Sequence, residues 1–231
     1  MSTKGMSMLL AVVMMLGLCG CSSKINDVLS ENMNHVINEA TKEVNNGDTI
    51  FLEAVEAYKD GDYAHAIEKC EEAKEKGLRK YSEATLYSVI GSCHLDLDMY
   101  EEAIEHYSKA VELEPDRVEH VVNLAIAYRQ SGDNGKAKEL YIQGLEIDPN
   151  YAELNSSLGS LYILENDPEM AIHCFDRAIE LDPSLAVAYG NGALAYALIG
   201  DFETADEYLE KAIVRGYTNA DIIKERIDAL R

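Results

Sequence analysis

Three segments of the sequence decide the fold: AVELEP at 110–115, GLEIDP at 144–149 and AIELDP at 178–183. In each segment an apolar and acidic stretch of helical character runs into a proline. The three prolines, Pro115, Pro149 and Pro183, are 34 residues apart. Proline cannot continue a helix, and it also disfavours helical geometry in the residue before it. The segments therefore mark helix ends at a fixed period, which predicts a repeating helical structure.

Other residues recur at the same spacing when the sequence is aligned on these prolines. They form columns of small residues (Gly91, Ala125, Gly159 and Ala193; Ala103, Ala137, Ala171 and Ala205) and of aromatic residues (Tyr128, Tyr162 and Tyr196; Tyr107, Tyr141 and Phe175). Between the columns lie turn signals such as Gly132-Asp133 and Gly200-Asp201. Glycine ends one helix and aspartate caps the next, so each period predicts two helices joined by a tight turn.

This pattern resembles the tetratricopeptide repeat (TPR) family, whose unit is a pair of antiparallel helices. The resemblance implies an all-α fold, a right-handed superhelical solenoid of such pairs. We expect five repeats followed by a C-terminal capping helix, and we expect about three extra residues near 79–82. The repeats are 47–80, 84–117, 118–151, 152–185 and 186–219, and the capping helix is 220–231, with Ile222, Ile223, Ile227 and Leu230 on its packed side.

The N-terminus has the pattern of a targeting signal. Lys4 precedes an apolar run from Met8 to Leu18, which is too short to cross a bilayer but has the length of a signal-peptide core. Leu18-Cys19-Gly20-Cys21 then resembles the bacterial lipobox, which implies that Cys21 carries lipid after cleavage of residues 1–20. We expect an extracytoplasmic protein that is lipid-anchored to a bacterial membrane, either the outer membrane or the outer leaflet of the cytoplasmic membrane.

Residues 21–46 would form a lipid-anchored helix or linker. Apolar residues recur there at helical spacing: Ile25, Val28, Leu29, Met33, Val36, Ile37, Ala40 and Val44. This segment would cover the first repeat, and a stalk or a helix that pairs two chains are the alternatives.

Charge and motifs restrict the function. The formal net charge of −22 excludes nucleic acid as a partner, since phosphate contacts need clustered Lys and Arg. We find no signature of an enzyme, a metal site or a cofactor site, and therefore predict no catalytic residues. Cys70, Cys93 and Cys174 occupy small, core-type positions and are predicted to be buried thiols, although Cys70 and Cys93 remain open as an oxidisable pair.

The resemblance implies that the first helix of each repeat lines a concave groove for a peptide. The matching positions include Val122, Asn123, Ile126, Ser156, Ser160, Asn191 and Leu194. Such a groove suits an apolar or amphipathic segment. The favoured function is a non-catalytic adaptor for protein or peptide partners of the cell envelope. The alternatives are a self-assembling structural protein, hence a homo-oligomer, and a receptor for a peptide or small ligand.

Overall fold

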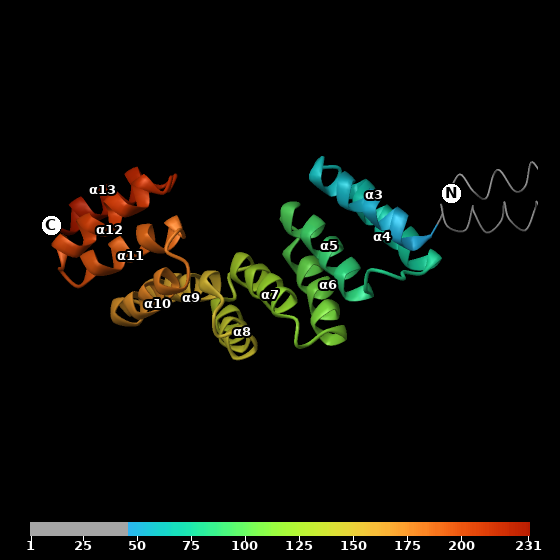
Figure 1. Ribbon diagram of the computed structural model, residues 1–231, viewed down its shortest axis with the longest axis horizontal. Coiled ribbons are helices and arrows are strands. Elements are labelled where there is room, and N and C mark those ends of the chain that lie inside the picture. Colours follow the sequence, from blue (N-terminus) through green and yellow to red (C-terminus); the bar gives the residue numbers. More distant parts are fainter. Residues whose placement is uncertain (1–45) are drawn as a thin grey trace, which may run out of the picture.

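The computed structural model describes residues 46–231, which fold into helices joined by short turns (Figure 1). Residues 1–45, with the expected signal peptide, Cys21 and nearly all of the 21–46 segment, lie outside the described residues. The helices are α3 (Gly47–Lys59), α4 (Tyr63–Lys76), α5 (Glu83–Asp96), α6 (Tyr100–Leu113), α7 (Val118–Gln130), α8 (Asn134–Ile147), α9 (Ala152–Leu164), α10 (Pro168–Leu181), α11 (Ala186–Leu198), α12 (Phe202–Val214) and α13 (Ala220–Leu230).

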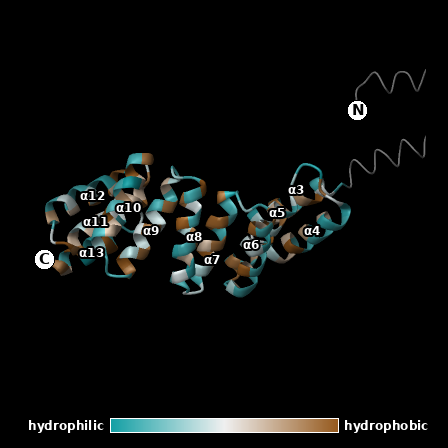
Figure 2. Cartoon of the chain, turned by 90° about the horizontal axis from the view of Figure 1, so that it is seen from below, coloured by the Kyte–Doolittle hydropathy of each residue, from teal (hydrophilic) through white to brown (hydrophobic). Residues whose placement is uncertain are grey.

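The helices form five hairpins, α3–α4 to α11–α12, and α13 follows the last of them. The described part contains no strand, which confirms the predicted all-α solenoid of helix pairs. In Figure 2, hydrophobic and hydrophilic residues alternate along the stack, as expected when one side of a helix packs and the other meets water.

Most hairpin turns combine a left-handed residue with an aspartate cap. Gly61, Gly132, Asn166 and Gly200 have φ between 60° and 92°. The next residue in each turn is an aspartate whose carboxylate accepts a hydrogen bond from a backbone N–H in the first turn of the second helix. In the second hairpin, Asp98 takes the left-handed position with φ of 58°, and the following Met99 caps nothing with its side chain. The turn chemistry therefore follows the sequence closely.

The extra residues after the first repeat form a loop between α4 and α5. The carboxylate of Asp48, at the start of α3, accepts hydrogen bonds from the backbone N–H groups of Arg79 (2.9 Å) and Lys80 (3.0 Å). These bonds also hold the pKa of Asp48 below its ordinary value. The loop is thus fastened to the first hairpin, so the longer spacing does not interrupt the stack.

Consecutive hairpins pack through three positions of each first helix. In α5 to α11 these positions are buried: Leu86, Ile90 and Cys93; His120, Leu124 and Ala127; Leu154, Leu158 and Leu161; Ala188, Gly192 and Ala195. Apart from His120, Leu158 and Gly192, they lie in clusters with residues of the preceding hairpin. The core of the protein is therefore a series of joints between hairpins, as expected for a repeat protein.

The N-terminal end of the stack is polar at these same positions. In α3 they carry Thr49, Glu53 and Glu56, all exposed. The leading face of α3 therefore offers carboxylates to solvent, whereas the equivalent face of every later hairpin is covered.

The C-terminal end is covered by α13. Ile223 and Ile227 are buried against α11 and α12, but Ile222 is 57% exposed and Leu230 is 43% exposed. The prediction that all four residues share the packed side is thus wrong for Ile222 and Leu230. For Ile222 the reason is the helix phase, because residues one position apart differ by about 100° around a helix axis. Leu230 lies on the side of Ile223 and Ile227, but it is the last residue of α13.

The stack follows an arc, and the first helices lie on its inner side (Figure 1). First helices of neighbouring hairpins touch each other in three cases, α3 with α5, α5 with α7, and α9 with α11, whereas α7 and α9 make no contact of similar extent. Among the described residues, neighbouring second helices make no contact of similar extent. Elements on the inner side of a curved stack are the ones that approach each other, so the contacts agree with the picture.

Candidate functional site

The candidate site is the inner face of α7, α9 and α11. We define this inner face by four positions per helix, spaced so that they lie along one side of it. They are Glu119, Asn123, Ile126 and Gln130 in α7; Glu153, Ser157, Ser160 and Leu164 in α9; and Val187, Asn191, Leu194 and Leu198 in α11. Each position recurs at 34 residues, so the three helices present a grid of side chains.

The residues predicted for the groove differ in how accessible they are to a partner. Ser156 and Leu194 are buried, and Val122 is half-buried against the cluster around Tyr141. Asn123, Ile126, Ser160 and Asn191 are half-buried on the inner face. Ser156, Leu194 and Val122 therefore serve mainly the packing of the stack, and the other four remain accessible.

Three of the predicted residues are connected by hydrogen bonds. The Ser160 hydroxyl donates to the backbone carbonyl of Ser156 (3.0 Å) and accepts from the Asn191 amide (3.2 Å). The Asn191 carbonyl oxygen in turn accepts from the Tyr217 hydroxyl (3.1 Å). Much of the bonding capacity of Asn191 is thus used inside the protein, so it is a positioned group of the face and less available to a ligand backbone.

Tyr217 reaches Asn191 because Gly190 has no side chain. A Cβ atom on Gly190 would lie 2.2 Å from a carbon of the Tyr217 ring. The ring therefore lies directly on the backbone of α11. This contact fixes the link between the last hairpin and the segment leading to α13.

Exposed leucines of the inner face were missed by the sequence analysis. Leu164 is 68% exposed and Leu198 is 36% exposed, at equivalent places near the ends of α9 and α11. Val187, at the other end of α11, is also exposed. The sequence did contain a signal for these exposed residues, because α9 and α11 carry more large apolar residues than their buried positions require. Exposed apolar side chains that recur on one face are typical of a contact surface.

The charges of the inner face are all negative. Glu119 and Glu153 are exposed at equivalent places at the start of α7 and α9. Burial of the ring raises the pKa of Tyr151, and the charges of Glu153 and Glu119 add to this effect, so both carboxylates lie near Tyr151. In α7, α9 and α11, Arg129 is the only lysine or arginine, and it stands one position beside the grid. The inner face thus has an acidic edge and an apolar edge.

A buried histidine joins the second and third hairpins beside this face. His120 is 3% exposed; its Nδ1 lies 2.8 Å from the Ser88 hydroxyl, and its Nε2 lies 3.2 Å from a Glu114 carboxylate oxygen. Hydrogen bonds from Ser82 and His120 hold the pKa of Glu114 below its ordinary value. The order serine, histidine, carboxylate is that of a hydrolase relay. Ser88, however, lies inside α5, where backbone N–H groups donate within the helix and are not available to an oxyanion. The arrangement therefore supports a structural joint.

The remaining reactive side chains are packed groups. Cys70, Cys93 and Cys174 are free and buried, as predicted, and burial raises the pKa of their thiols to about 12, 11 and 11. The His94 and His106 rings stack, with centroids 5.2 Å apart. Burial lowers the pKa of His106, and the nearby His94 and Lys109 add to this effect. Within residues 46–231, no group of three or more His, Cys, Asp or Glu is placed to hold a metal ion.

Comparison with known families identifies the repeat. Tetratricopeptide repeats match residues 82–150, 152–185 and 186–213. The chain belongs to the tetratricopeptide repeat family. The three matches cover α7, α9 and α11, so the inner face is built from TPR first helices. Comparison with curated protein sequences gives no significant match. Of the helices in residues 46–231, none combines the length and apolar character needed to cross a bilayer.

Solved structures share the TPR fold with this chain. MamA matches with 21% identity and a TM-score of 0.61, over 73% of this chain and 96% of MamA. A tetratricopeptide repeat protein from Parabacteroides merdae matches with 20% identity and a TM-score of 0.67, over 80% and 72% of the two chains. A thermophilic TPR protein in Thermus thermophilus matches with 19% identity and a TM-score of 0.59, over 80% and 98%. At these identities the likeness establishes the fold.

Proposed function

We propose that this TPR protein is a non-catalytic adaptor of the bacterial cell envelope, held at a membrane by lipid on Cys21, and that it binds a partner through its inner face. The carrying observation is the exposure of Leu164 and Leu198 on that face. Burying a leucine side chain contributes roughly 1.5–3 kcal/mol. Two exposed leucines at equivalent places therefore represent binding energy that the isolated chain leaves unused.

The anchor proposal rests on the sequence pattern that ends at Cys21. The polar leading face of α3, with Thr49, Glu53 and Glu56, suits exposure to water more than burial under another helix. The covering helix predicted for residues 21–46 lies almost entirely outside the described residues and stays a prediction.

The adaptor proposal is tested by crosslinking in cells. The protein is crosslinked, purified and analysed by mass spectrometry, in the original form and as the double variant Leu164→Glu, Leu198→Glu. Leu113→Glu is the matched control, because Leu113 is 52% exposed on the second helix α6. We expect one envelope complex to be recovered with the original and control proteins and lost with the double variant. Equal recovery with all three proteins would remove the inner face from the proposal.

The anchor has a test of its own. Cells expressing the Cys21→Ser variant are fractionated after feeding with a palmitate analogue that can be detected by click chemistry. We expect the original protein to carry the label and to sediment with membranes, and the variant to lose both properties. Label that persists on the Cys21→Ser variant would assign the lipid to another residue.

The polar leading face of α3 argues against one alternative, self-assembly by end-to-end stacking of chains. It would bury Glu53 and Glu56 of α3, which form ion pairs with Lys69 (3.7 Å) and Lys59 (2.7 Å). Burying an ion pair removes both charges from water, which is costly. A receptor for a small ligand would need an enclosed site, and the inner face of α7, α9 and α11 is open. The adaptor is therefore the favoured function.

A further inference from the structure

The two edges of the inner face indicate which kind of partner it fits, and this inference rests on the proposed function. One edge carries Glu119 and Glu153, and the other carries Leu164 and Leu198. Between them stand uncharged polar groups such as Asn123 and Ser157. A complementary surface needs cationic side chains for the first edge and apolar side chains for the second.

The spacing of the edges restricts the shape of the partner. Glu153 and Leu164 are 11 residues apart on the same side of α9, which at 1.5 Å per residue is roughly 16 Å. A helix that lies across the inner face in the direction of the stack would meet both edges with different sides. An amphipathic segment satisfies this geometry, whereas a uniformly apolar segment would leave the carboxylates without partners.

The carboxylates of the acidic edge are available to such a segment. Glu153 makes no ion pair among the described residues, and Glu119 is paired only with the exposed Arg117, at 3.4 Å. Exposed pairs of this kind contribute little to stability, so a partner can replace Arg117 at small cost. The nearest cation within the three helices, Arg129, stands beside the grid and leaves both glutamates unneutralised.

We propose that the inner face of α7, α9 and α11 binds a basic amphipathic segment of a partner protein, with its Lys or Arg side chains along Glu119 and Glu153 and its apolar side chains on Leu164 and Leu198. An anionic segment is repelled by the acidic edge, and an anionic lipid surface is repelled for the same reason. The specificity therefore comes from charge, and most of the affinity comes from the leucines.

The test uses three fluorescein-labelled peptides of equal length and helical spacing, one with Leu and Lys, one with Leu and Glu, and one with Ser and Lys. Fluorescence anisotropy with the purified protein measures each Kd. We expect the Leu–Lys peptide to bind most tightly. Binding of the Ser–Lys peptide with equal affinity would show attraction to the net charge alone and would overturn the proposal, as would tighter binding of the Leu–Glu peptide.

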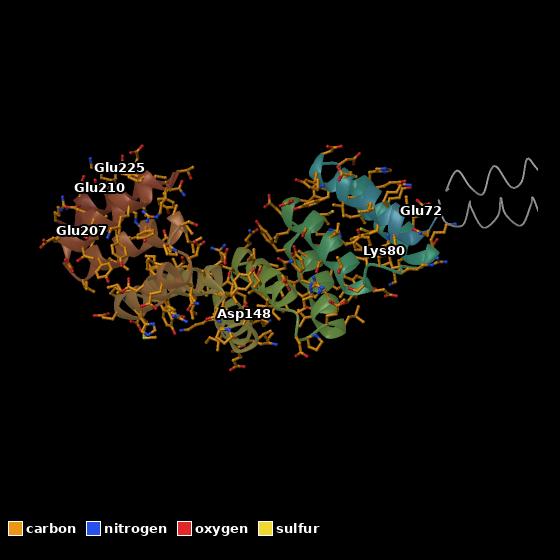
Figure 3. All side chains as sticks on the ribbon, in the orientation of Figure 1. Glu72, Lys80, Asp148, Glu207, Glu210 and Glu225 are labelled. Atoms are coloured by element: carbon orange, nitrogen blue, oxygen red, sulfur yellow. The ribbon has the colours of Figure 1, made fainter. Side chains whose placement is uncertain are left out.

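Matched variants locate the binding. The double variant Leu164→Ser, Leu198→Ser should raise the Kd of the Leu–Lys peptide by about tenfold or more, whereas Leu113→Ser should have little effect. The double variant Glu119→Gln, Glu153→Gln should also raise the Kd of this peptide and reduce the dependence of the Kd on salt concentration. Glu207→Gln with Glu210→Gln is the charge-matched control, because both residues project from α12 at the C-terminal end of the arc, away from α7 and α9 (Figure 3). Equal losses in the two glutamate pairs would overturn the proposal.

This experiment separates the two proposals. If the leucine variant loses its partner in cells but the three peptides bind alike, the adaptor function stands and the basic partner is wrong. If the peptides bind as expected but crosslinking in cells recovers no partner through the inner face, the surface chemistry is right and the adaptor function fails.

Discussion

Replacing Gly190 by alanine should destabilise the protein through a single clash. The new Cβ atom would lie 2.2, 2.5 and 2.7 Å from three carbons of the Tyr217 ring. Carbon atoms pack at about 3.5–4.0 Å, so the ring must retreat by roughly 1.3 Å or more. Tyr217 packs against the cluster that holds Ile223 and Ile227, and its hydroxyl donates to Asn191. Retreat of the ring therefore disturbs the packing of α13 and the inner face together.

The expected magnitude follows from three contributions. Forced repacking costs about 1–3 kcal/mol, and loss of the hydroxyl bond to Asn191 costs about 1 kcal/mol. Alanine gains about 0.5–1 kcal/mol over glycine in a helix interior. The net loss is roughly 1–3.5 kcal/mol, and at about 2–4 °C per kcal/mol for a chain of this size it lowers the Tm by roughly 2–14 °C.

Urea and thermal unfolding followed by circular dichroism measure this loss. Gly135→Ala is the control, because its Cβ would meet only a side-chain oxygen of Asp133 at 3.6 Å, an ordinary contact, and this substitution should be neutral or stabilising. A double-mutant cycle with Tyr217→Ala isolates the clash. If Gly190→Ala destabilises the Tyr217→Ala protein as much as the original protein, the clash with Tyr217 is not the cause and the reasoning is refuted.

Three further changes test buried groups. Burial lowers the pKa of His106 in the folded chain, so the unfolded chain binds a proton there first as the pH falls. Thermal melts should therefore show stability falling as the pH drops below about 6.5, and His106→Gln should flatten this dependence. An unchanged slope in the variant would contradict the prediction. His120→Leu, which restores the leucine found at the equivalent Leu86 and Leu154, should keep the Tm within a few degrees, whereas His120→Ala should lower it clearly by leaving a cavity. In a dithionitrobenzoate assay at pH 8, Cys70 should react only as fast as the protein opens, because its thiol is buried and its pKa is raised to about 12; rapid labelling of the native protein would contradict this.

The fold could be predicted from the sequence because its main determinants are local. Pro115, Pro149 and Pro183 end helices through their own backbone, and an aspartate such as Asp133 caps the helix that follows it by accepting a hydrogen bond from the backbone N–H three residues on. The small columns at Gly91 and Gly159 are equally local in their effect, since a Cβ there would lie 2.9 Å from an aromatic ring of the same hairpin. Each signal acts within one repeat and recurs in the next repeat, so several copies support the same assignment of repeat boundaries.

The candidate site was less predictable because it depends on contacts between repeats. Ser156 and Leu164 both belong to α9, but only the packing of neighbouring hairpins determines that the first is buried and the second is exposed. The link from Tyr217 to Asn191 joins residues 26 positions apart through a glycine whose role is visible only in three dimensions. Sequence spacing identifies the side of a helix, whereas the tilt between hairpins decides which residues of that side remain accessible.

The distribution of polar and apolar residues over the joints explains why the inner face remains as the site. The leading face of α3 replaces the buried columns by Thr49, Glu53 and Glu56, which prevents another hairpin from stacking there without burying carboxylates. Single exposed apolar residues are common on protein surfaces, whereas their recurrence at equivalent places of one face is typical of a contact surface. Leu164 and Leu198 stay exposed, at equivalent places and beside an acidic edge that discourages contact with a second copy of this acidic chain. The leucines of the inner face favour binding, and its glutamates disfavour a second copy of this acidic chain. The partner that fits such a surface therefore carries the opposite charge.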